Sequence, residues 1–175
     1  MNNLSIDIIM PVYKAKKTIK RTLESIMYQI NSEKFNIYLV NDCDNEDYSE
    51  IINIFKPYLN IKELKMAKNG GPGLARQHGV DNSNGEYIVF IDADDYFYGP
   101  EAIIKMYDKM KENDLDLLIS NFRYERNNEI EIKKQKTRVN FKYLHSRFFY
   151  SKTACKMLFF NSLQTVYCFR LQRYN

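Results

Sequence analysis

The sequence has no tryptophan and few of the residues that define several special classes: three cysteines, four prolines and six glycines among 175 residues. Cys43, Cys155 and Cys168 are too few and too scattered for a disulfide framework or a zinc site. Scarce proline and glycine exclude a collagen-like or low-complexity chain. No apolar run approaches the ~20 residues of a membrane-spanning helix, and no leader-like segment precedes the first strand-like one. These absences predict a reduced, cytoplasmic, globular protein.

Acidic residues are absent from the last part of the sequence. From Ile132 to Asn175 there are ten Lys or Arg and no Asp or Glu, so residues 1–131 carry a net charge of −6 although the whole chain carries +4. The basic stretch, residues 133–173, is either a solvated surface or a docking surface for an acidic partner chain or an anionic membrane. In the membrane case the protein is peripheral to the inner face of the membrane. A nucleic-acid partner is not expected.

Hydrophobic periodicity alternates between strand and helix over the first 120 residues. Short apolar runs predict strands over residues 4–10, 35–41, 61–66, 86–91 and 115–120. Apolar residues at helical spacing predict helices over 15–29, over 48–58, from Leu74 onward and over 103–110. Pro11 is expected to end the first strand. This alternation predicts an α/β fold with a mostly parallel sheet and helices on both faces.

Later residues follow a different pattern. Residues 122–132 are typical of a β-hairpin that turns at Asn127-Asn128. Beyond Asn140 no clear period emerges. We therefore predict an α/β domain over residues 1–125, followed over residues 126–175 by the hairpin and a less regular, basic and aromatic tail.

Three carboxylates follow the most apolar predicted strand, in the order Asp92-Ala93-Asp94-Asp95. Like charges this close repel one another unless water or a cation neutralises them. Mg²⁺ or Mn²⁺ prefers oxygen ligands and commonly combines one or two carboxylates with the phosphates of a substrate. The cluster predicts a metal-diphosphate site at Asp92, Asp94 and Asp95, and an acidic turn or helix cap is the alternative.

Two further clusters lie near predicted strand or helix ends. Gly71 belongs to a glycine-rich stretch ahead of a helix, and Arg76 lies one turn into that helix; helix N-termini and guanidinium groups both suit phosphate. Asp42 follows the second strand and could accept a hydrogen bond from a base or ribose. An ordinary turn explains either cluster alone. Ligands of open α/β sheets bind outside the carboxyl ends of the strands, so one shared site is favoured.

Four motifs in order resemble the family 2 glycosyltransferases. The opening strand and turn of that family resemble Ile8-Ile9-Met10-Pro11-Val12-Tyr13, and its strand ending in two aspartates resembles Leu39-Val40-Asn41-Asp42, with Asn41 in place of the first aspartate. Its NxGxxxARNxG segment is similar to residues 69–79, with Gln77 in place of Asn. Its DADD-type metal motif is matched by residues 92–95. The resemblance covers about residues 5–122 and implies a Rossmann-type GT-A fold.

The resemblance also implies roles for these residues. Pro11, Val12, Tyr13 and Asp42 would line a uridine pocket, with Asp42 facing the uracil, and Gly71 and Arg76 would help to hold the nucleotide. Asp92 would contact the ribose or the metal, and Asp94 and Asp95 would hold Mg²⁺ or Mn²⁺ on the diphosphate. The implied reaction transfers a sugar from a nucleotide-sugar donor, in the first place a UDP-sugar, to a hydroxyl of a sugar or glycan acceptor in surface polysaccharide synthesis.

The later carboxylate that serves this family as general base is missing, because no Asp or Glu follows Glu131. A shortened donor-binding chain and a base supplied by a partner chain are the two leading explanations, and His145 as base is a weaker third. Two other functions stay open. One is a non-catalytic nucleotide-sugar-binding protein, and the other is a sugar nucleotidyltransferase, although the first strand lacks the glycine-rich basic loop that such enzymes need.

Overall fold

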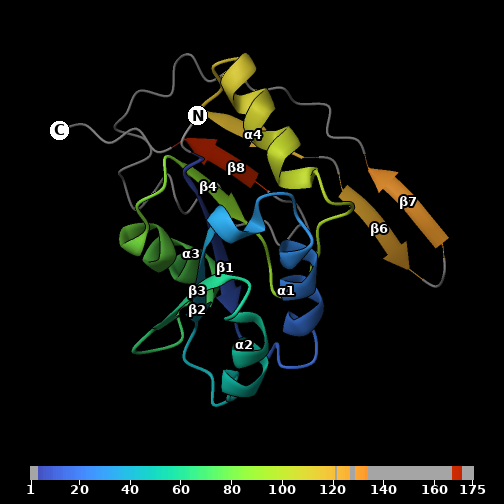
Figure 1. Ribbon diagram of the computed structural model, residues 1–175. Helices are drawn as coiled ribbons and strands as arrows, with labels where there is room; N and C mark the ends of the chain where they lie inside the picture. The colour runs from blue at the N-terminus through green and yellow to red at the C-terminus, as the bar shows by residue number, and fades with distance from the viewer. Residues whose placement is uncertain (1–3, 121, 127–128, 134–166, 171–175) are drawn as a thin grey trace.

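The computed structural model describes residues 4–120, 122–126, 129–133 and 167–170 (Figure 1). Strands and helices alternate as β1 (Ile6–Val12), α1 (Ile19–Met27), β2 (Asn36–Asn41), α2 (Ser49–Phe55), β3 (Asn60–Lys65), α3 (Gly71–Asn82), β4 (Tyr87–Phe90), α4 (Ala102–Glu112) and β5 (Leu117–Ile119). A short 3₁₀ turn, η1 (Ser32–Lys34), precedes β2. The predicted order of elements is confirmed, with shifts of a few residues at their ends.

The main sheet has the order β3-β2-β1-β4-β8-β5, where β8 is Tyr167–Arg170. Strands β3, β2, β1 and β4 run parallel. Strand β8 lies antiparallel between β4 and β5, so that a strand from near the end of the chain completes a sheet begun at its start. The sequence did not predict this strand. The predicted hairpin is confirmed as β6 (Phe122–Arg126) and β7 (Glu129–Lys133).

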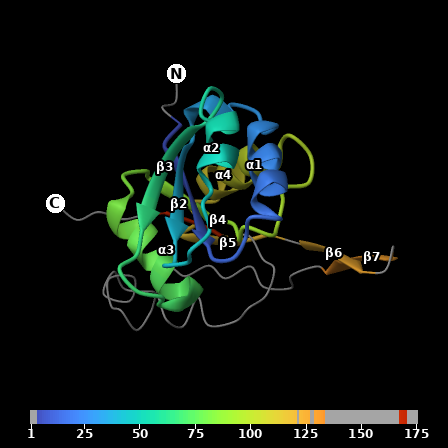
Figure 2. The same ribbon diagram turned by 90° about the horizontal axis from the view of Figure 1, so that it is seen from below.

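Helices cover both faces of the sheet, as predicted (Figure 2). Helices α1, α2 and α4 pack on one face over the larger apolar core, whose strand residues include Ile8 and Val89. Helix α3 packs on the other face, where Gly79 brings the helix close: a Cβ at Gly79 would lie 2.4 Å from Cγ2 of Ile9. The absence of a side chain at this position therefore sets the helix-to-sheet distance.

Pro11 lies inside β1 and does not end it, contrary to the prediction. Its residue partner in β2 is Val40. On the other side of β1, the pairing with β4 ends at Ile9 and Phe90. The amide hydrogen that proline lacks would point to that side, where no strand needs it, so the ring is tolerated. Strand β1 thereby reaches Val12 and carries the following loop further outward.

The glycine-rich stretch, residues 70–73, is called the glycine cluster below. The predicted helix after it begins earlier than Leu74, at Gly71. Pro72 suits the first turn of a helix because that position needs no amide hydrogen. The backbone N–H groups at the helix start also donate hydrogen bonds to the carboxylate of Asp42, which follows β2. The glycine cluster is therefore the first turn of α3 and not a separate loop ahead of it.

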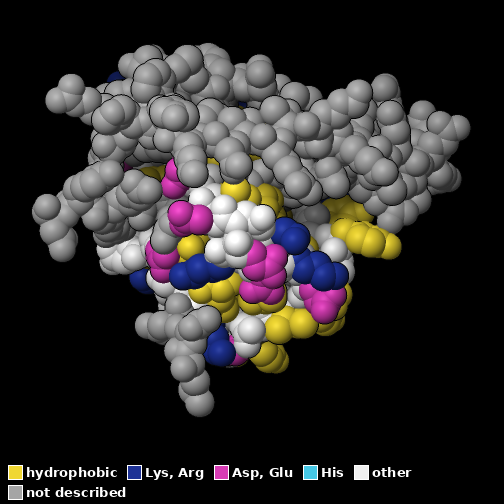
Figure 3. All heavy atoms as spheres, turned by 90° about the horizontal axis from the view of Figure 1, so that it is seen from above, with side chains coloured by type: hydrophobic (Ala, Val, Ile, Leu, Met, Phe, Trp, Pro, Cys, Tyr) yellow, Lys and Arg dark blue, Asp and Glu magenta, His cyan; other side chains and the backbone are white. Residues whose placement is uncertain are grey.

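Helix α4 presents a surface of mixed charge. Its exposed ion pairs join Lys105 to Glu101 at 2.7 Å and Lys109 to Glu112 at 3.3 Å. On the face seen in Figure 3, described basic and acidic side chains lie next to one another with apolar ones between them. Exposed pairs of this kind contribute about 0–1 kcal/mol each.

None of the helices among the described residues has the length and apolarity to cross a membrane.

Candidate functional site

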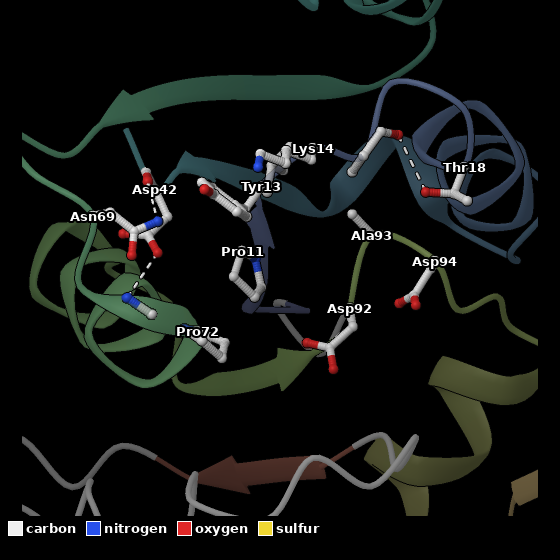
Figure 4. Close-up of a pocket in the computed structure, with 13 residues that line it drawn as sticks. Pro11, Tyr13, Lys14, Thr18, Asp42, Asn69, Pro72, Asp92, Ala93 and Asp94 are labelled. Carbon is white, nitrogen blue, oxygen red and sulfur yellow. Dashed lines mark hydrogen bonds between the residues drawn. The ribbon is translucent and has the colours of Figure 1, made fainter. Parts of the chain in front are cut away.

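The predicted polar clusters meet in one pocket at the carboxyl ends of the parallel strands (Figure 4). The cavity measures about 540 Å³. Asp42 and Asn69 lie on one side of it, Asp92 and Asp94 lie on the other, and Pro11 lies between them. The lining residues are Pro11, Val12, Tyr13, Lys14, Ala15, Thr18, Asp42, Asn69, Gly71, Pro72, Asp92, Ala93 and Asp94.

Asp42 joins β2 to the start of α3. Its carboxylate oxygens accept hydrogen bonds from the backbone N–H groups of Gly70 and Gly71, both at 2.8 Å, and the side chain is 3% exposed. The side chain of Asn69 donates to the backbone carbonyl of Asp42 at 3.1 Å. Asp42 therefore caps a helix from a different element, and each of its carboxylate oxygens keeps a further lone pair that can accept a hydrogen bond.

Tyr13 and Lys14 form the exposed rim of the pocket at the end of β1. The Tyr13 side chain is 48% exposed, and the Lys14 ammonium lies 5.1 Å from the centre of its ring. Lys14 has a positive φ of 51°, a conformation that costs energy for a residue with a side chain. A hydrogen bond of 2.6 Å from the Lys14 backbone N–H to the Asp44 carboxylate holds this conformation.

Asp44 lies at the centre of a network that the sequence did not reveal. Its carboxylate also accepts from the Tyr48 hydroxyl at 2.5 Å and from the Asn41 side chain at 3.1 Å. The Tyr48 oxygen in turn accepts from the backbone N–H of Ala15 at 3.1 Å. Burial raises the pKa of Asp44, but the hydrogen bonds outweigh it and leave the pKa below its ordinary value. Burial and the neighbouring carboxylates raise the pKa of Tyr48.

Arg76 reaches from α3 to the acidic cluster and forms an ion pair with Asp92. The Arg76 side chain is 13% exposed and that of Asp92 is 33% exposed, so the pair is only partly screened by water. Two motifs separated by 16 residues are thus in direct contact. The guanidinium neutralises one of the three carboxylates and fixes its orientation beside the pocket.

Asp94 and Asp95 follow in a tight turn, closed by a hydrogen bond of 3.0 Å from the Asp95 N–H to the Asp92 carbonyl. Asp94 is exposed and lines the pocket, whereas Asp95 is half-buried. Burial and then the charges of Asp92 and Asp94 raise the pKa of Asp95 to about 6. Negative charge is therefore concentrated here beyond what the nearby arginines offset.

The acidic cluster fits a divalent cation that is shared with a ligand. Among residues 4–120 and the other described segments, no three His, Cys, Asp or Glu side chains converge to hold a metal alone. Hard cations such as Mg²⁺ commonly use one or two carboxylates and complete their shell with phosphate oxygens and water. Asp94 is exposed to the pocket, and a cation would relieve the repulsion that raises the pKa of Asp95.

The predicted residues are thus largely brought together. Gly71 and the first strand residues line the pocket, while Arg76 acts on it through Asp92. His145 lies outside the described residues, as does most of the basic stretch 133–173. Two lining residues, Lys14 and Thr18, were not predicted. Asn69 belongs to the motif over residues 69–79 but was given no role in the site.

The chain resembles known proteins in family profile, in sequence and in structure. The profile of the family described as Glycosyl transferase family 2 matches residues 7–173. The chain is 34% identical over 119 residues to a poly(ribitol-phosphate) beta-glucosyltransferase of Bacillus spizizenii, in a match that covers 66% of this chain and 19% of that protein. The chain therefore spans about a fifth of the length of that curated relative.

Two solved structures share the fold. Residues 1–349 of S. aureus TarS, in complex with UDP-GlcNAc, align with a TM-score of 0.59 and 28% identity over 65% of this chain and 33% of that chain. A mannosyltransferase of Pyrobaculum calidifontis, in complex with GDP-Man and Mn²⁺, aligns with a TM-score of 0.60 over 65% of this chain and 34% of that chain. At 16% identity, the second likeness concerns the fold alone. Both are glycosyltransferases, and their alignment confirms the GT-A fold expected from the resemblance.

The match over residues 7–173, the mostly parallel sheet and the pocket that joins Asp42 to the carboxylates of Asp92 and Asp94 agree with one another. The chain belongs to glycosyl transferase family 2.

Proposed function

We propose that the protein transfers a sugar from a UDP-sugar or a similar nucleotide sugar to a hydroxyl group of a glycan acceptor. The observation that carries this proposal is a single pocket with Asp42 and Tyr13 in one part and Asp92 and Asp94 in another. A nucleotide diphosphate has the matching order of groups: a base that accepts and donates hydrogen bonds, a ribose and then a doubly charged phosphate chain.

The uridine would lie against Pro11, Val12 and Tyr13. The exposed Tyr13 ring offers a face for stacking, and Asp42 offers the free lone pairs of a fixed carboxylate to the base. Gly71, at the start of α3, would admit the nucleotide close to the backbone, because no side chain occupies that space. Arg76 would act by holding Asp92 in place for the ribose or the metal.

Of the predicted set Asp92, Asp94 and Asp95, one or two carboxylates would hold Mg²⁺ or Mn²⁺ on the diphosphate, and Asp94, which lines the pocket, would be the first of them. When bound, the cation would neutralise the leaving nucleoside diphosphate. The residues around it keep their own tasks: Arg76 offsets the charge of Asp92, and Arg21 lowers the pKa of Asp95 against the burial that raises it. The residue that removes the proton from the acceptor hydroxyl is not assigned, and His145 stays a candidate from the sequence.

The acceptor would be a surface polysaccharide or its precursor. Relatives named for the glucosylation of poly(ribitol-phosphate), or for its N-acetylglucosaminylation in Staphylococcus aureus, support this class of acceptor. The basic stretch 133–173 would suit a phosphate-bearing acceptor, a partner chain or the inner membrane surface. A cytoplasmic location, expected from the few and scattered cysteines, is part of this proposal.

Calorimetric titration of UDP into the purified chain, with and without Mn²⁺, tests the proposal. We expect binding that requires the metal and is much weaker for uridine, which lacks the diphosphate. Asp94→Asn should abolish the metal-dependent part of binding while leaving thermal stability equal or higher, because like-charge repulsion decreases. Asp81→Asn, an exposed carboxylate change on α3, is the matched control. An Asp94→Asn variant that binds UDP as tightly as the parent would refute the site.

A further inference from the structure

The segment between β4 and α4 carries the acidic cluster but has no regular structure of its own. Hydrogen bonds from side chains of α1 hold its backbone in place. Three consecutive carbonyls, those of Ala93, Asp94 and Asp95, accept hydrogen bonds from two consecutive residues of α1. We call residues 92–95 the acidic turn, since they bear the carboxylates assigned to the metal.

Thr22 makes two of these three contacts. Its hydroxyl lies 3.0 Å from the Ala93 carbonyl oxygen and 2.6 Å from that of Asp95, and its side chain is fully buried. A hydroxyl has one proton, so the two carbonyls share it. Arg21 makes the third contact, at 2.8 Å from its guanidinium to the Asp94 carbonyl. The backbone on either side of Asp94 is thereby fixed relative to α1.

The same face of α1 continues the row further along the segment. The Ser25 hydroxyl accepts from the backbone N–H of Phe97 at 3.1 Å. Gln29, just past the end of the helix, donates to the Gly99 carbonyl at 2.7 Å and accepts from the N–H of Ile103 at 3.2 Å. Thr22, Ser25 and Gln29 are spaced by three and then four residues, so they lie in one line along the helix. We call these three residues the polar row.

The polar row is anchored by the core. The neighbouring residues Ile19, Leu23 and Ile26 of α1 are fully buried against the sheet. A helix fixed in this way cannot follow the acidic turn if the turn moves, so the turn must conform to the helix. Partners of metal-binding groups that do not touch the metal themselves commonly set the orientation of the ligands and the affinity for the ion.

We infer that the polar row positions the carboxylates of the acidic turn for the divalent cation, with Thr22 as its principal positioning residue. The inference rests on the proposed function, because it assigns the row to the metal-diphosphate site described there. It goes beyond that function by placing metal affinity under the control of a helix that contributes no ligand. Thr22 acts through the backbone of Ala93 and Asp95, so its role is positional and not catalytic.

The experiment measures the Mn²⁺ concentration that gives half-maximal UDP binding, by calorimetric titration of the full chain at a series of Mn²⁺ concentrations. Thr22→Val keeps the shape of the side chain and removes the proton donor. We expect this variant to need roughly tenfold more Mn²⁺, with UDP affinity near the parent value once Mn²⁺ is saturating. Thr22→Ser restores the hydroxyl and should restore the parent requirement.

Two further variants separate positioning from general packing. Ser25→Ala removes a half-buried contact two residues beyond Asp95 and should raise the Mn²⁺ requirement by roughly threefold; it keeps the test open if Thr22→Val does not fold. Ser32→Ala removes a buried hydroxyl that donates to the Met27 carbonyl at 2.9 Å, at the other end of α1. It should leave the Mn²⁺ requirement unchanged even where it lowers the thermal midpoint.

The outcomes distinguish the two proposals. If the parent binds UDP only with Mn²⁺ and both Thr22→Val and Ser25→Ala keep the parent requirement, the positioning role is wrong and the proposed function stands. A shift of equal size in Ser32→Ala would also overturn the positioning role, because it would trace the effect to lost stability. If the parent binds no UDP at any Mn²⁺ concentration, the proposed function fails, and the role of the polar row fails with it.

Discussion

The carboxylate of Asp42 holds the start of a helix and also lines the pocket. It follows the last residue of β2, caps α3 through the N–H groups of Gly70 and Gly71, and lines the pocket. The sequence predicts the ligand-facing part from the position at a strand end. The capping part was not predictable, because it joins residues that are 28 and 29 positions apart. The hydrogen bonds to Asp42 therefore hold the start of α3 in place before any nucleotide is bound.

Asp42→Asn is expected to lower the free energy of unfolding by roughly 1–3 kcal/mol. The amide NH₂ replaces one acceptor oxygen, so one of the two glycine N–H groups loses its buried partner. Urea denaturation at neutral pH measures this change, and UDP affinity should fall in the same variant. Asp81→Asn, whose carboxylate is exposed, should change the free energy of unfolding by less than ~0.5 kcal/mol. An Asp42→Asn protein as stable as the parent would show that the capping bonds contribute little.

At the scale of elements, the loops after β1 and β2 are locked together around Asp44. The carboxylate receives the backbone N–H of Lys14 from one loop and the side chains of Asn41 and Tyr48 from its own side of the pocket. A second link joins the Lys16 N–H to Glu46 at 2.9 Å. The pocket rim that carries Tyr13 is thus shaped by a different loop, which no local sequence pattern indicates.

The lowered pKa of Asp44 predicts a pH dependence of stability. A carboxyl whose pKa is lower in the folded state stabilises the fold above its ordinary pKa of 3.8, and this contribution is lost as pH falls through the folded value. Asp44→Asn should therefore cost roughly 1–3 kcal/mol at pH 7. The difference between parent and variant should shrink as the pH is lowered below 3.8.

Urea denaturation of parent and variant at pH 7 and near pH 3 checks this expectation. Asp81→Asn, the change of an exposed carboxylate on α3, is the control. A free-energy difference between the parent and Asp44→Asn that stays constant over this pH range would mean that the charge of Asp44 does not stabilise the loops.

At the scale of the whole molecule, the main sheet includes a strand from far along the chain, which lies between β4 and β5. Strand β8 pairs antiparallel with β4 on one side and β5 on the other, so that Cys168 faces Val89 and Leu118 in the two neighbouring strands. The family match extends to residue 173 and includes this strand. The predicted division at residue 125 stays a prediction, although β8 shows that residues beyond it join the main sheet.

Cys168→Pro is expected to destabilise the whole protein. Proline cannot donate to a neighbouring strand and is not tolerated in the centre of a sheet. The free energy of unfolding should fall by at least the ~1–3 kcal/mol of one lost backbone hydrogen bond in a strand that has a neighbour on each side. Cys168→Ser keeps the backbone N–H and serves as the control in the same thermal and urea measurements. Equal stability of the proline and serine variants would mean that β8 does not contribute to the sheet in solution.

The sequence by itself determined the order of the elements and the place of the site. Apolar runs and helical spacing are local properties, and they predicted strands, helices and the hairpin within a few residues of their ends. The carboxyl ends of parallel strands meet at one edge of a sheet, so the strand order along the chain was enough to place Asp42, Asp92 and Asp94 around one pocket. Lys14 and Thr18, which line the pocket but belong to no motif, were missed.

The tertiary structure alone decided how those residues are held. Thr22 and the acidic turn are more than 70 residues apart, and β8 enters the sheet almost 80 residues after the end of β4. Such contacts depend on which surfaces pack against each other, and no local period or spacing encodes them. Pro11 shows the same limit, since its place inside β1 became understandable only once the end of β4 beside it was known.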